Sequence, residues 1–267
     1  MKVNGYVYAR NIFLTVQVRI CIIFLMNIFK YDEITSTNDF LKENYKSYPD
    51  NAVIVAKKQT AGRGRTGRTF ISPEGGLYIS ILLKKTGMEK IPFITPMTAI
   101  AVVRTLTKFI PKKLAVKWVN DVYADGKKIC GILCEGKFSE DMPEYIVVGI
   151  GLNVFIPSLG FDKEIEKKVI SAFDEYYIDE TDFNNKIDML REDVVSEFFN
   201  LYNNFDPRLI NKLYTDYAMY VGENAVIEIG ENKYFGKIIG FNDKCNIILE
   251  TESGKRIFSS GTLLPSE

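Results

Sequence analysis

Residues 61–83 read AGRGRTGRTFISPEGGLYISILL, and this stretch decides between competing folds. Its glycines at Gly62, Gly64 and Gly67 satisfy G-x-G-x-x-G and come close to G-x-x-x-x-G-K-[ST], with arginine where the lysine should stand. Both patterns bind phosphate at the N-terminus of a helix that follows the glycines. Here Pro73 and two glycines lead into alternating β-branched and aromatic residues, which predict a loop followed by a strand. The sequence therefore argues against both nucleotide-binding folds.

The arginines of this loop then become its informative residues. Arg63, Arg65 and Arg68 lie close together, and guanidinium groups are permanently charged, forked donors suited to phosphate and carboxylate. The intervening glycines let the backbone approach a ligand closely. The sequence predicts an anion-binding loop, and a merely solvated basic turn remains the alternative on charge alone.

Composition limits the chemistry. The 267 residues are 46% hydrophobic and 25% charged, as expected of one large domain plus a small one. Lys+Arg and Asp+Glu both number 34, so no net positive field favours DNA as a partner. The chain has no histidine, which removes the usual general base and the Ser-His and Cys-His nucleophile pairs. Its four cysteines are predicted to be reduced, and Cys130 and Cys134 to pack in the core instead of binding zinc.

The N-terminal residues have a doubtful status. Residues 12–29 are largely apolar, but Gln17 and Arg19 interrupt them and no small-residue cleavage site follows. We therefore expect neither a membrane span nor a secretory signal. Residues 1–28 are predicted to be an extension outside the folded unit, with Met26 as the working start, in a cytoplasmic protein.

Alternating strand and helix signals follow. Ser36 or Thr37 is predicted to cap a helix, residues 52–58 and 76–85 to form strands, and Thr95 with Pro96 to begin a helix that ends near Phe109. Residues 114–138 predict two or three strands, with a hairpin turn at Asp125-Gly126, and residues 145–155 the central strand of the sheet. Helices are expected at about 163–174, 182–203 and 207–219, and a small β-barrel after Val221-Gly222.

Four segments resemble the signature segments of the biotin protein ligases, in that family's order and approximate spacing. They are STN (36–38), QTAGRGRTGRTF (59–70), KWVNDVYADGKKICGILCE (117–135) and GIGLNV (149–154). The resemblance implies an α+β fold like that of class II aminoacyl-tRNA synthetases, with a mixed sheet flanked by helices in a catalytic domain at 29–220. It also implies a small SH3-like β-barrel at 221–267.

The resemblance further implies an activity. Such an enzyme activates biotin with ATP to biotinyl-5′-AMP and diphosphate, with Mg²⁺, and transfers biotin to a lysine of the biotin carboxyl carrier domain of acetyl-CoA carboxylase or a related carboxylase. Repressor-type members begin with a winged helix-turn-helix, for which there is no room before Ser36, so the ligase-only form is expected. An exposed strand edge would suit either a homodimer or acceptor docking.

Site residues carry over by position. The resemblance assigns biotin binding to Ser36, Thr37, Asn38, Gln59, Gly62, Arg63, Gly64, Arg65, Lys128 and Gly131. It assigns ATP binding to Arg65, Arg68, Phe70, Asn120, Lys128 and Asn153, and catalysis to Lys128, Arg65 and Asp121. Magnesium ligands stay unassigned, although Asn120, Asp121 and Asn153 match positions near the nucleotide and the metal.

Plainer interpretations stay open for several of these residues. Ser36 to Asn38 would serve as a helix cap, and Asp121 as a simple turn residue. Trp118 is predicted to be a half-buried strand residue with a satisfied indole N–H. Lys127 should face solvent beside Lys128, because strand neighbours point to opposite faces.

Two departures from the family pattern and two rival functions remain. Val119 replaces the proline of the family's KWPND, and Phe70 replaces a tryptophan, so adenine stacking should be weaker. A lipoate-protein ligase shares the fold, but its loop carries serine and consecutive glycines. A non-enzymatic regulator that uses the arginine loop is the second rival.

Overall fold

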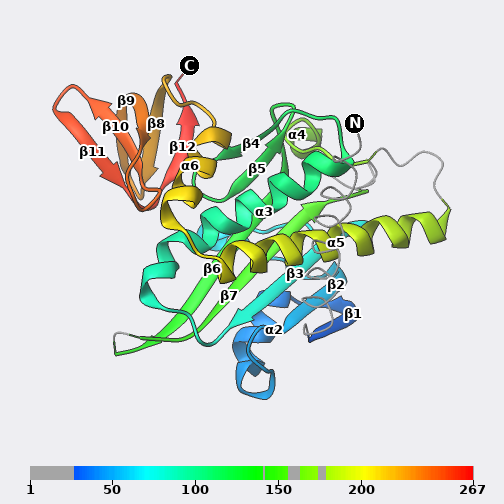
Figure 1. Cartoon of the computed structure of the whole chain (residues 1–267). Helices are drawn as coiled ribbons and strands as arrows, with labels where there is room; N and C mark the ends of the chain where they lie inside the picture. The colour runs from blue at the N-terminus through cyan, green and yellow to red at the C-terminus, as the bar shows by residue number, and fades with distance from the viewer. Residues whose placement is uncertain (1–26, 141, 156–162, 174–178, 267) are drawn as a thin grey trace, which may run out of the picture.

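The chain folds into a seven-stranded mixed sheet covered by helices and a five-stranded antiparallel sheet at the C-terminus (Figure 1). This computed structural model describes residues 27–140, 142–155, 163–173 and 179–266. The predicted mixed α and β fold is confirmed. The N-terminal extension predicted at 1–28 lies outside the described residues except for its last two, and β1 already begins at Ile28.

The large sheet has β7 at its centre, as the apolar sequence of that strand predicts. Its strands are β1 (Ile28–Ile34), β2 (Val53–Gln59), β3 (Gly76–Leu83), β4 (Leu114–Lys117), β5 (Asp121–Ala124), β6 (Lys127–Ser139) and β7 (Met142–Asn153), in the spatial order β1-β2-β3-β7-β6-β5-β4. β1 and β2 pair in parallel, and all other neighbours are antiparallel. β1 has no counterpart among the strands predicted from the sequence.

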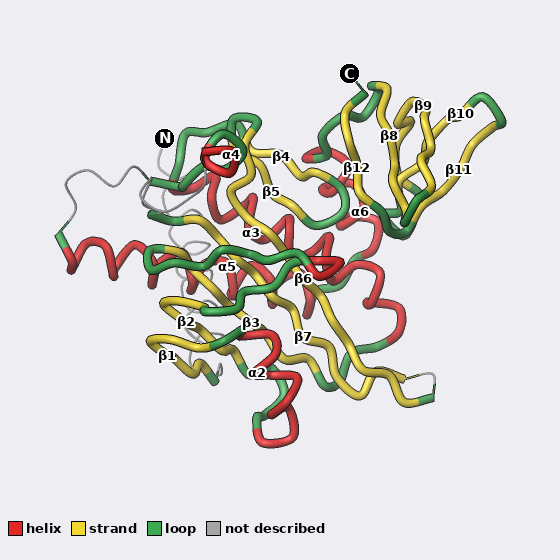
Figure 2. The backbone as a smooth tube through the Cα atoms, turned by 180° about the vertical axis from the view of Figure 1, so that it is seen from behind, coloured by secondary structure: helices red, strands yellow, loops and turns green. Residues whose placement is uncertain are grey.

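The two faces of this sheet are covered differently, and the alternation along β7 shows why. Ile146, Val148 and Ile150 belong to the main core, which packs against α3 (Ile94–Phe109) and α5 (Glu180–Asn203). Tyr145 and Val147 point the other way and pack with α2 (Thr37–Asn44). Figure 2 shows the molecule from behind, with the face that carries α2 toward the viewer.

Local signals placed most elements correctly. Ser36 is the N-cap of α2, and its side chain accepts a hydrogen bond from the Asp39 N–H at 3.3 Å. The β5–β6 turn has Asp125 at φ 49° and Gly126 at φ 78°, the two positive φ angles of a tight hairpin turn, as predicted. Short 3₁₀ turns occur at Tyr45–Ser47, Arg65–Gly67 and Met88–Phe93.

Two helix predictions are wrong. Thr95 does not cap α3, because the 3₁₀ turn Met88–Phe93 leads directly into it and the helix begins at Ile94. The helix predicted at 163–174 is a single turn, α4 (Lys163–Glu166), and a turn at 167–168 follows it. Val169 instead forms a parallel bridge with Lys128, because the backbone groups at the start of β6 are free to pair there.

The C-terminal sheet packs on α6 (Pro207–Tyr217), where Tyr214 meets Phe241 edge-on at 5.3 Å between ring centroids. Its strands are β8 (Asn224–Ile229), β9 (Asn232–Phe241), β10 (Ile247–Thr251), β11 (Gly254–Phe258) and β12 (Thr262–Pro265), in the order β11-β10-β9-β8-β12. β12 was not predicted as a separate strand from the sequence. Within the described part of the chain, no helix is long and apolar enough to cross a membrane.

Candidate active site

A cavity opens on the face of the large sheet that carries α2. Its lining brings together the N-terminus of α2, the Gly/Arg loop (residues 62–70) and strands β6 and β7, which lie far apart in the sequence. Eight of the ten predicted biotin-binding residues line it: Ser36, Thr37, Asn38, Gln59, Arg63, Gly64, Lys128 and Gly131. Of the predicted ATP-binding residues, Phe70, Asn120 and Lys128 line it.

The first turn of α2 supplies one wall of the cavity. Ser36, Thr37 and Asn38 are nearly fully buried, with 2–4% of their surface exposed. Gln59, at the end of β2, fixes this turn because its Oε1 accepts from the Thr37 backbone N–H at 2.9 Å and from Thr37 Oγ1 at 3.1 Å. Helix capping and cavity lining therefore occur together, and the two interpretations of this segment do not compete.

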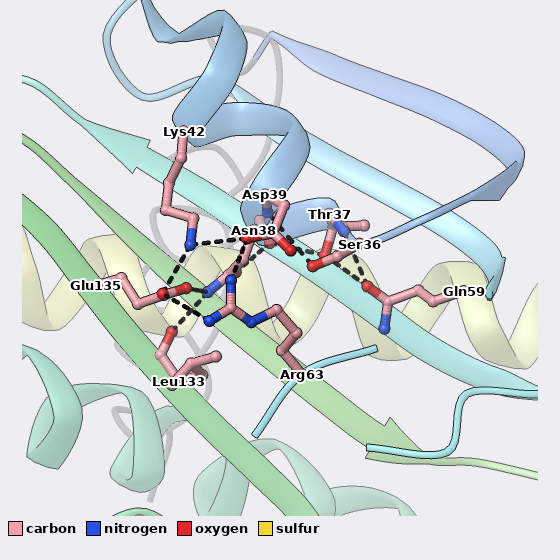
Figure 3. A network of polar contacts seen from close by, with 10 residues as sticks. Ser36, Thr37, Asn38, Asp39, Lys42, Gln59, Arg63, Leu133 and Glu135 are labelled. Atoms are coloured by element: carbon pink, nitrogen blue, oxygen red, sulfur yellow. Dashed lines mark hydrogen bonds and ion pairs between the residues drawn. The ribbon is translucent and has the colours of Figure 1, made fainter. Parts of the chain in front are cut away.

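Asn38 is fixed from three sides. Its Nδ2 donates to the Leu133 carbonyl at 3.1 Å and to Glu135 Oε2 at 3.0 Å (Figure 3). Its Oδ1 accepts from Ser80 Oγ at 2.6 Å. Gly149 leaves the space for this amide, since a Cβ there would lie 2.3 Å from Asn38 Oδ1. The wall is thus rigid, neutral and rich in hydrogen-bonding groups.

The Gly/Arg loop folds back on itself as a small hairpin. The Phe70 N–H donates to the Gly62 carbonyl at 2.9 Å, and the Gly64 N–H donates to the Arg68 carbonyl at 2.7 Å. Gly62 does not line the cavity but is needed for this fold, because a Cβ there would meet the Phe70 carbonyl at 2.3 Å. No helix follows the loop, in agreement with the sequence analysis.

The arginines of the loop point to different partners. Arg63 pairs with Asp39 at 2.7 Å. Arg65 does not line the cavity; it donates to Asn120 Oδ1 at 2.9 Å and to the Gly261 carbonyl, next to β12, at 3.2 Å. Arg68 is exposed. The loop therefore connects α2, the β4–β5 turn and the C-terminal sheet.

Charge is concentrated beside the cavity. Burial lowers the pKa of the Arg65 guanidinium from its ordinary value. The negative charge of Asp121 opposes this shift, and the like charge of Arg68 adds to it. Burial also lowers the pKa of the Lys117 ammonium. Asp121 again opposes the shift, and repulsion from Lys128 and Arg68 lowers the pKa further. An anionic ligand would relieve this repulsion.

Lys128 contributes its ammonium to the cavity from β6. Its Nζ lies 2.7 Å from Asp121 Oδ1 and 5.8 Å from the centre of the Phe70 ring. Its backbone is fixed by residues beyond α4: the Lys128 N–H donates to the Lys168 carbonyl at 2.9 Å and its carbonyl accepts from Ile170 at 3.0 Å. Lys127, the neighbouring residue, is exposed, as the strand alternation predicts.

A pair of glycines makes room for Phe70. Gly131 and Gly151 are partners across β6 and β7, and a Cβ would come within 3.0 Å of the Phe70 ring at the first and 2.6 Å at the second. The ring therefore packs over these two glycines, with Lys128 beside it. Neither Gly149 nor Gly151 was selected from the sequence, although two glycines spaced by two in an apolar strand mark one face as needing space.

Other predicted residues lie nearby without lining the cavity. Asn153 is 5% exposed, and its Nδ2 donates to the Ile170 carbonyl at 3.3 Å, so its described contacts are structural. Asp121 begins β5 and faces Lys128. Within the described residues, no three of His, Cys, Asp and Glu cluster as they would around a metal ion held by protein side chains alone.

The prediction for Trp118 is wrong in three respects. It lies in the turn between β4 and β5 instead of in a strand, and it is 3% exposed. Its indole N–H has no hydrogen-bond partner among the described residues. Cys130 is fully buried and both it and Cys134 are free thiols, as predicted.

Comparison with known proteins identifies the same region. Residues 29–153 match the model of the biotin/lipoate A/B protein ligase family. The bifunctional ligase/repressor BirA of Bacillus spizizenii is 32% identical over 86% of this chain and 71% of its own. The biotin–[acetyl-CoA-carboxylase] ligase of Paracoccus denitrificans is 26% identical over 78% of this chain and 87% of its own.

Among solved structures, the biotin protein ligase from Aquifex aeolicus in complex with biotin and ATP superposes with a TM-score of 0.72. It is 29% identical, and the match covers 89% of this chain and 97% of that one. The matched family segment begins in β1 and ends with β7, so it contains every strand and loop that lines the cavity. The chain therefore belongs to the biotin/lipoate A/B protein ligase family.

Proposed function

We propose that this protein is a biotin protein ligase, which forms biotinyl-5′-AMP from biotin and ATP and then transfers biotin to a lysine of an acceptor protein. The observation that carries the proposal is the convergence of a neutral, hydrogen-bonding wall and a cationic rim on one cavity. The Aquifex relative, whose solved complex contains biotin and ATP, has the same fold.

The neutral wall suits the ureido ring of biotin. That ring is uncharged and carries two N–H donors and one carbonyl acceptor. The first turn of α2 has hydroxyl and amide groups that include both hydrogen-bond donors and acceptors. Because Thr37 and Asn38 are already fixed by Gln59, Ser80 and β6, the ring would enter a preorganised site. The carboxylate tail of biotin would then extend toward Lys128.

The first step needs positive charge and no general base. The biotin carboxylate is ionised near pH 7 and attacks the α-phosphorus of ATP, forming the carboxyl–phosphate bond and releasing diphosphate. Lys128 and Arg65 would reduce the repulsion between carboxylate and triphosphate and stabilise the charge that develops in the transition state. Arg68 lies exposed beside them, where a triphosphate would extend.

Phe70 provides a flat apolar surface next to Lys128, on which we expect the adenine to stack. Asn120 and Asp121 fit a magnesium ion, because Mg²⁺ is usually held by one or two carboxylates together with substrate phosphates. When bound, the metal supplies further neutralisation of phosphate charge. Asn153 would act through the chain segment that fixes Lys128.

In the second step a lysine amine of the acceptor attacks the carboxyl carbon of the adenylate, and AMP leaves. The amine must lose a proton, and Asp121 is the carboxylate nearest to Lys128. We assign to it the orientation or acceptance of that proton. The expected acceptor is the biotin carboxyl carrier domain of a carboxylase in the cytoplasm. Zero net charge gives no support to DNA as a partner, and β1 offers a sheet edge for a homodimer or for the acceptor.

The proposal is tested by biotin-dependent ATP–diphosphate exchange, followed by labelling of a biotin carrier domain. Lys128→Ala should lower exchange by about 10²–10³, the usual effect of removing one charged donor from a transition state. Lys127→Ala is the matched control and should exchange at the wild-type rate. Exchange driven by lipoate and not by biotin would refute the proposal in favour of the lipoate-specific activity.

A further inference from the structure

Four alternating charges form a closed ring beside the cavity. Asp39 Oδ1 lies 2.7 Å from Arg63 Nη1 and 2.7 Å from Lys42 Nζ. Glu135 Oε1 lies 2.7 Å from the same Lys42 Nζ and 4.0 Å from Arg63 Nη2. Figure 3 shows the four side chains pointing toward one another from α2, β6 and the loop.

This ring changes the role to be expected of Arg63. Its charge is already balanced by two carboxylates, whereas Arg68 is exposed and Arg65 meets neutral oxygens. The Arg63 side chain also lines the cavity, together with the backbone of Gly64. A guanidinium held in this way fixes the loop across the cavity, and it is poorly suited to follow a phosphate.

Asp39 links Arg63 to the wall of the cavity that the first turn of α2 forms. It lies in the first turn of α2, directly after Ser36, Thr37 and Asn38. The Glu135 carboxylate also contacts both α2 and the Gly/Arg loop. Its Oε2 accepts from Asn38, and its Oε1 faces Lys42 and Arg63. The helix turn that would hold the biotin ring is therefore the same turn that holds the loop.

We propose that Asp39, supported by Glu135, is a positioning residue that holds the Gly/Arg loop closed over the cavity through Arg63. The proposal rests on the proposed function for what the closed loop retains, namely biotinyl-adenylate. Loss of the Asp39 charge leaves the Lys42–Glu135 pair in place, so α2 stays anchored to β6 while the loop loses its main contact.

The first experiment measures loop opening without any substrate. Trypsin cleaves after arginine, and cleavage within the hairpin requires the loop to open locally. Asp39→Asn should be cleaved between residues 63 and 69 about tenfold faster than the wild type, equivalent to about 1.4 kcal/mol. Glu43→Gln changes the same charge on an exposed position of the same helix and should be cleaved at the wild-type rate.

The second experiment measures retention of the intermediate. Labelled biotinyl-adenylate is formed on the enzyme, and its release is followed in excess unlabelled adenylate. At a temperature where both proteins are fully folded, Asp39→Asn should release it about tenfold faster, and Asp39→Glu should restore most of the slow release. In an Arg63→Met background, Asp39→Asn should add nothing, because the two residues act through one contact.

The outcomes separate the two proposals. If the wild type forms no adenylate, the proposed function is refuted, while the trypsin result still decides whether Asp39 holds the loop. If the wild type forms adenylate but Asp39→Asn is cleaved and releases it at wild-type rates, the positioning role is refuted. An undiminished effect of Asp39→Asn in the Arg63→Met background would also refute it.

Discussion

Gly149 is the position at which a single methyl group should do most damage to the cavity. It faces α2 from the centre of the sheet, between Ser80 on β3 and Leu133 on β6. In Gly149→Ala the new Cβ would lie 2.3 Å from Asn38 Oδ1 and 2.9 Å from its Cγ. The amide must retreat until this separation exceeds 3.0 Å.

That retreat cannot be made without breaking hydrogen bonds. The Asn38 amide is held by the Leu133 carbonyl, Glu135 and Ser80 at 2.6–3.1 Å. Each such bond contributes about 0.5–1.5 kcal/mol net, so the loss of two or three should lower the free energy of unfolding by about 1–4 kcal/mol. A shift of about 1 Å in a positioning group costs about 10²-fold in rate, so kcat/KM for biotin should fall by that order.

Urea unfolding measures the loss of stability in Gly149→Ala, and diphosphate exchange at varied biotin concentrations measures its kcat/KM for biotin. Gly136→Ala is a suitable control in the same sheet, because its Cβ would meet neighbours at 3.2–3.4 Å. Adding Asn38→Ala to Gly149→Ala should recover stability but not biotin affinity, since the clash and the amide are removed together. A Gly149→Ala variant with wild-type stability and an unchanged KM for biotin would refute the reasoning.

Three further predictions concern neighbouring groups. Gly151→Ala brings a Cβ within 2.6 Å of the Phe70 ring, which is half-buried and can rotate away, so the KM for ATP should rise more than the KM for biotin in steady-state assays. Burial raises the pKa of Asp39, but hydrogen bonds and charges from Lys42 and Arg63 outweigh it and hold the pKa below its ordinary value. Its stabilising contribution is therefore present above the ordinary carboxyl pKa and lost as the pH falls through the lowered value, and urea titrations of Asp39→Asn should show a smaller loss on acidification. Burial raises the pKa of Cys134 to about 11, so iodoacetamide at pH 8 should label it in native protein far more slowly than in urea, as peptide mapping would show; comparable rates would contradict this burial.

Local chemistry made much of the fold predictable. Ser36 as an N-cap, Asp125-Gly126 as a tight turn and the apolar alternation of β7 depend on a few adjacent residues, and the structure contains all three. The extended stretch after the Gly/Arg loop excluded a helix-capped phosphate site for the same reason. Predictions failed where tertiary contacts outweigh propensity: Val169 pairs with the start of β6 instead of continuing α4.

The sequence by itself determined which segments take part in the site, because the side-chain types and their order along the chain are local properties. Only the tertiary structure decided what each side chain meets. Three arginines in one loop look equivalent in the sequence, yet Arg63 contacts carboxylates, Arg65 contacts neutral oxygens and Arg68 faces solvent. Their partners come from α2, the β4–β5 turn and the C-terminal sheet, and electrostatic contacts depend on distances in space that sequence spacing does not fix.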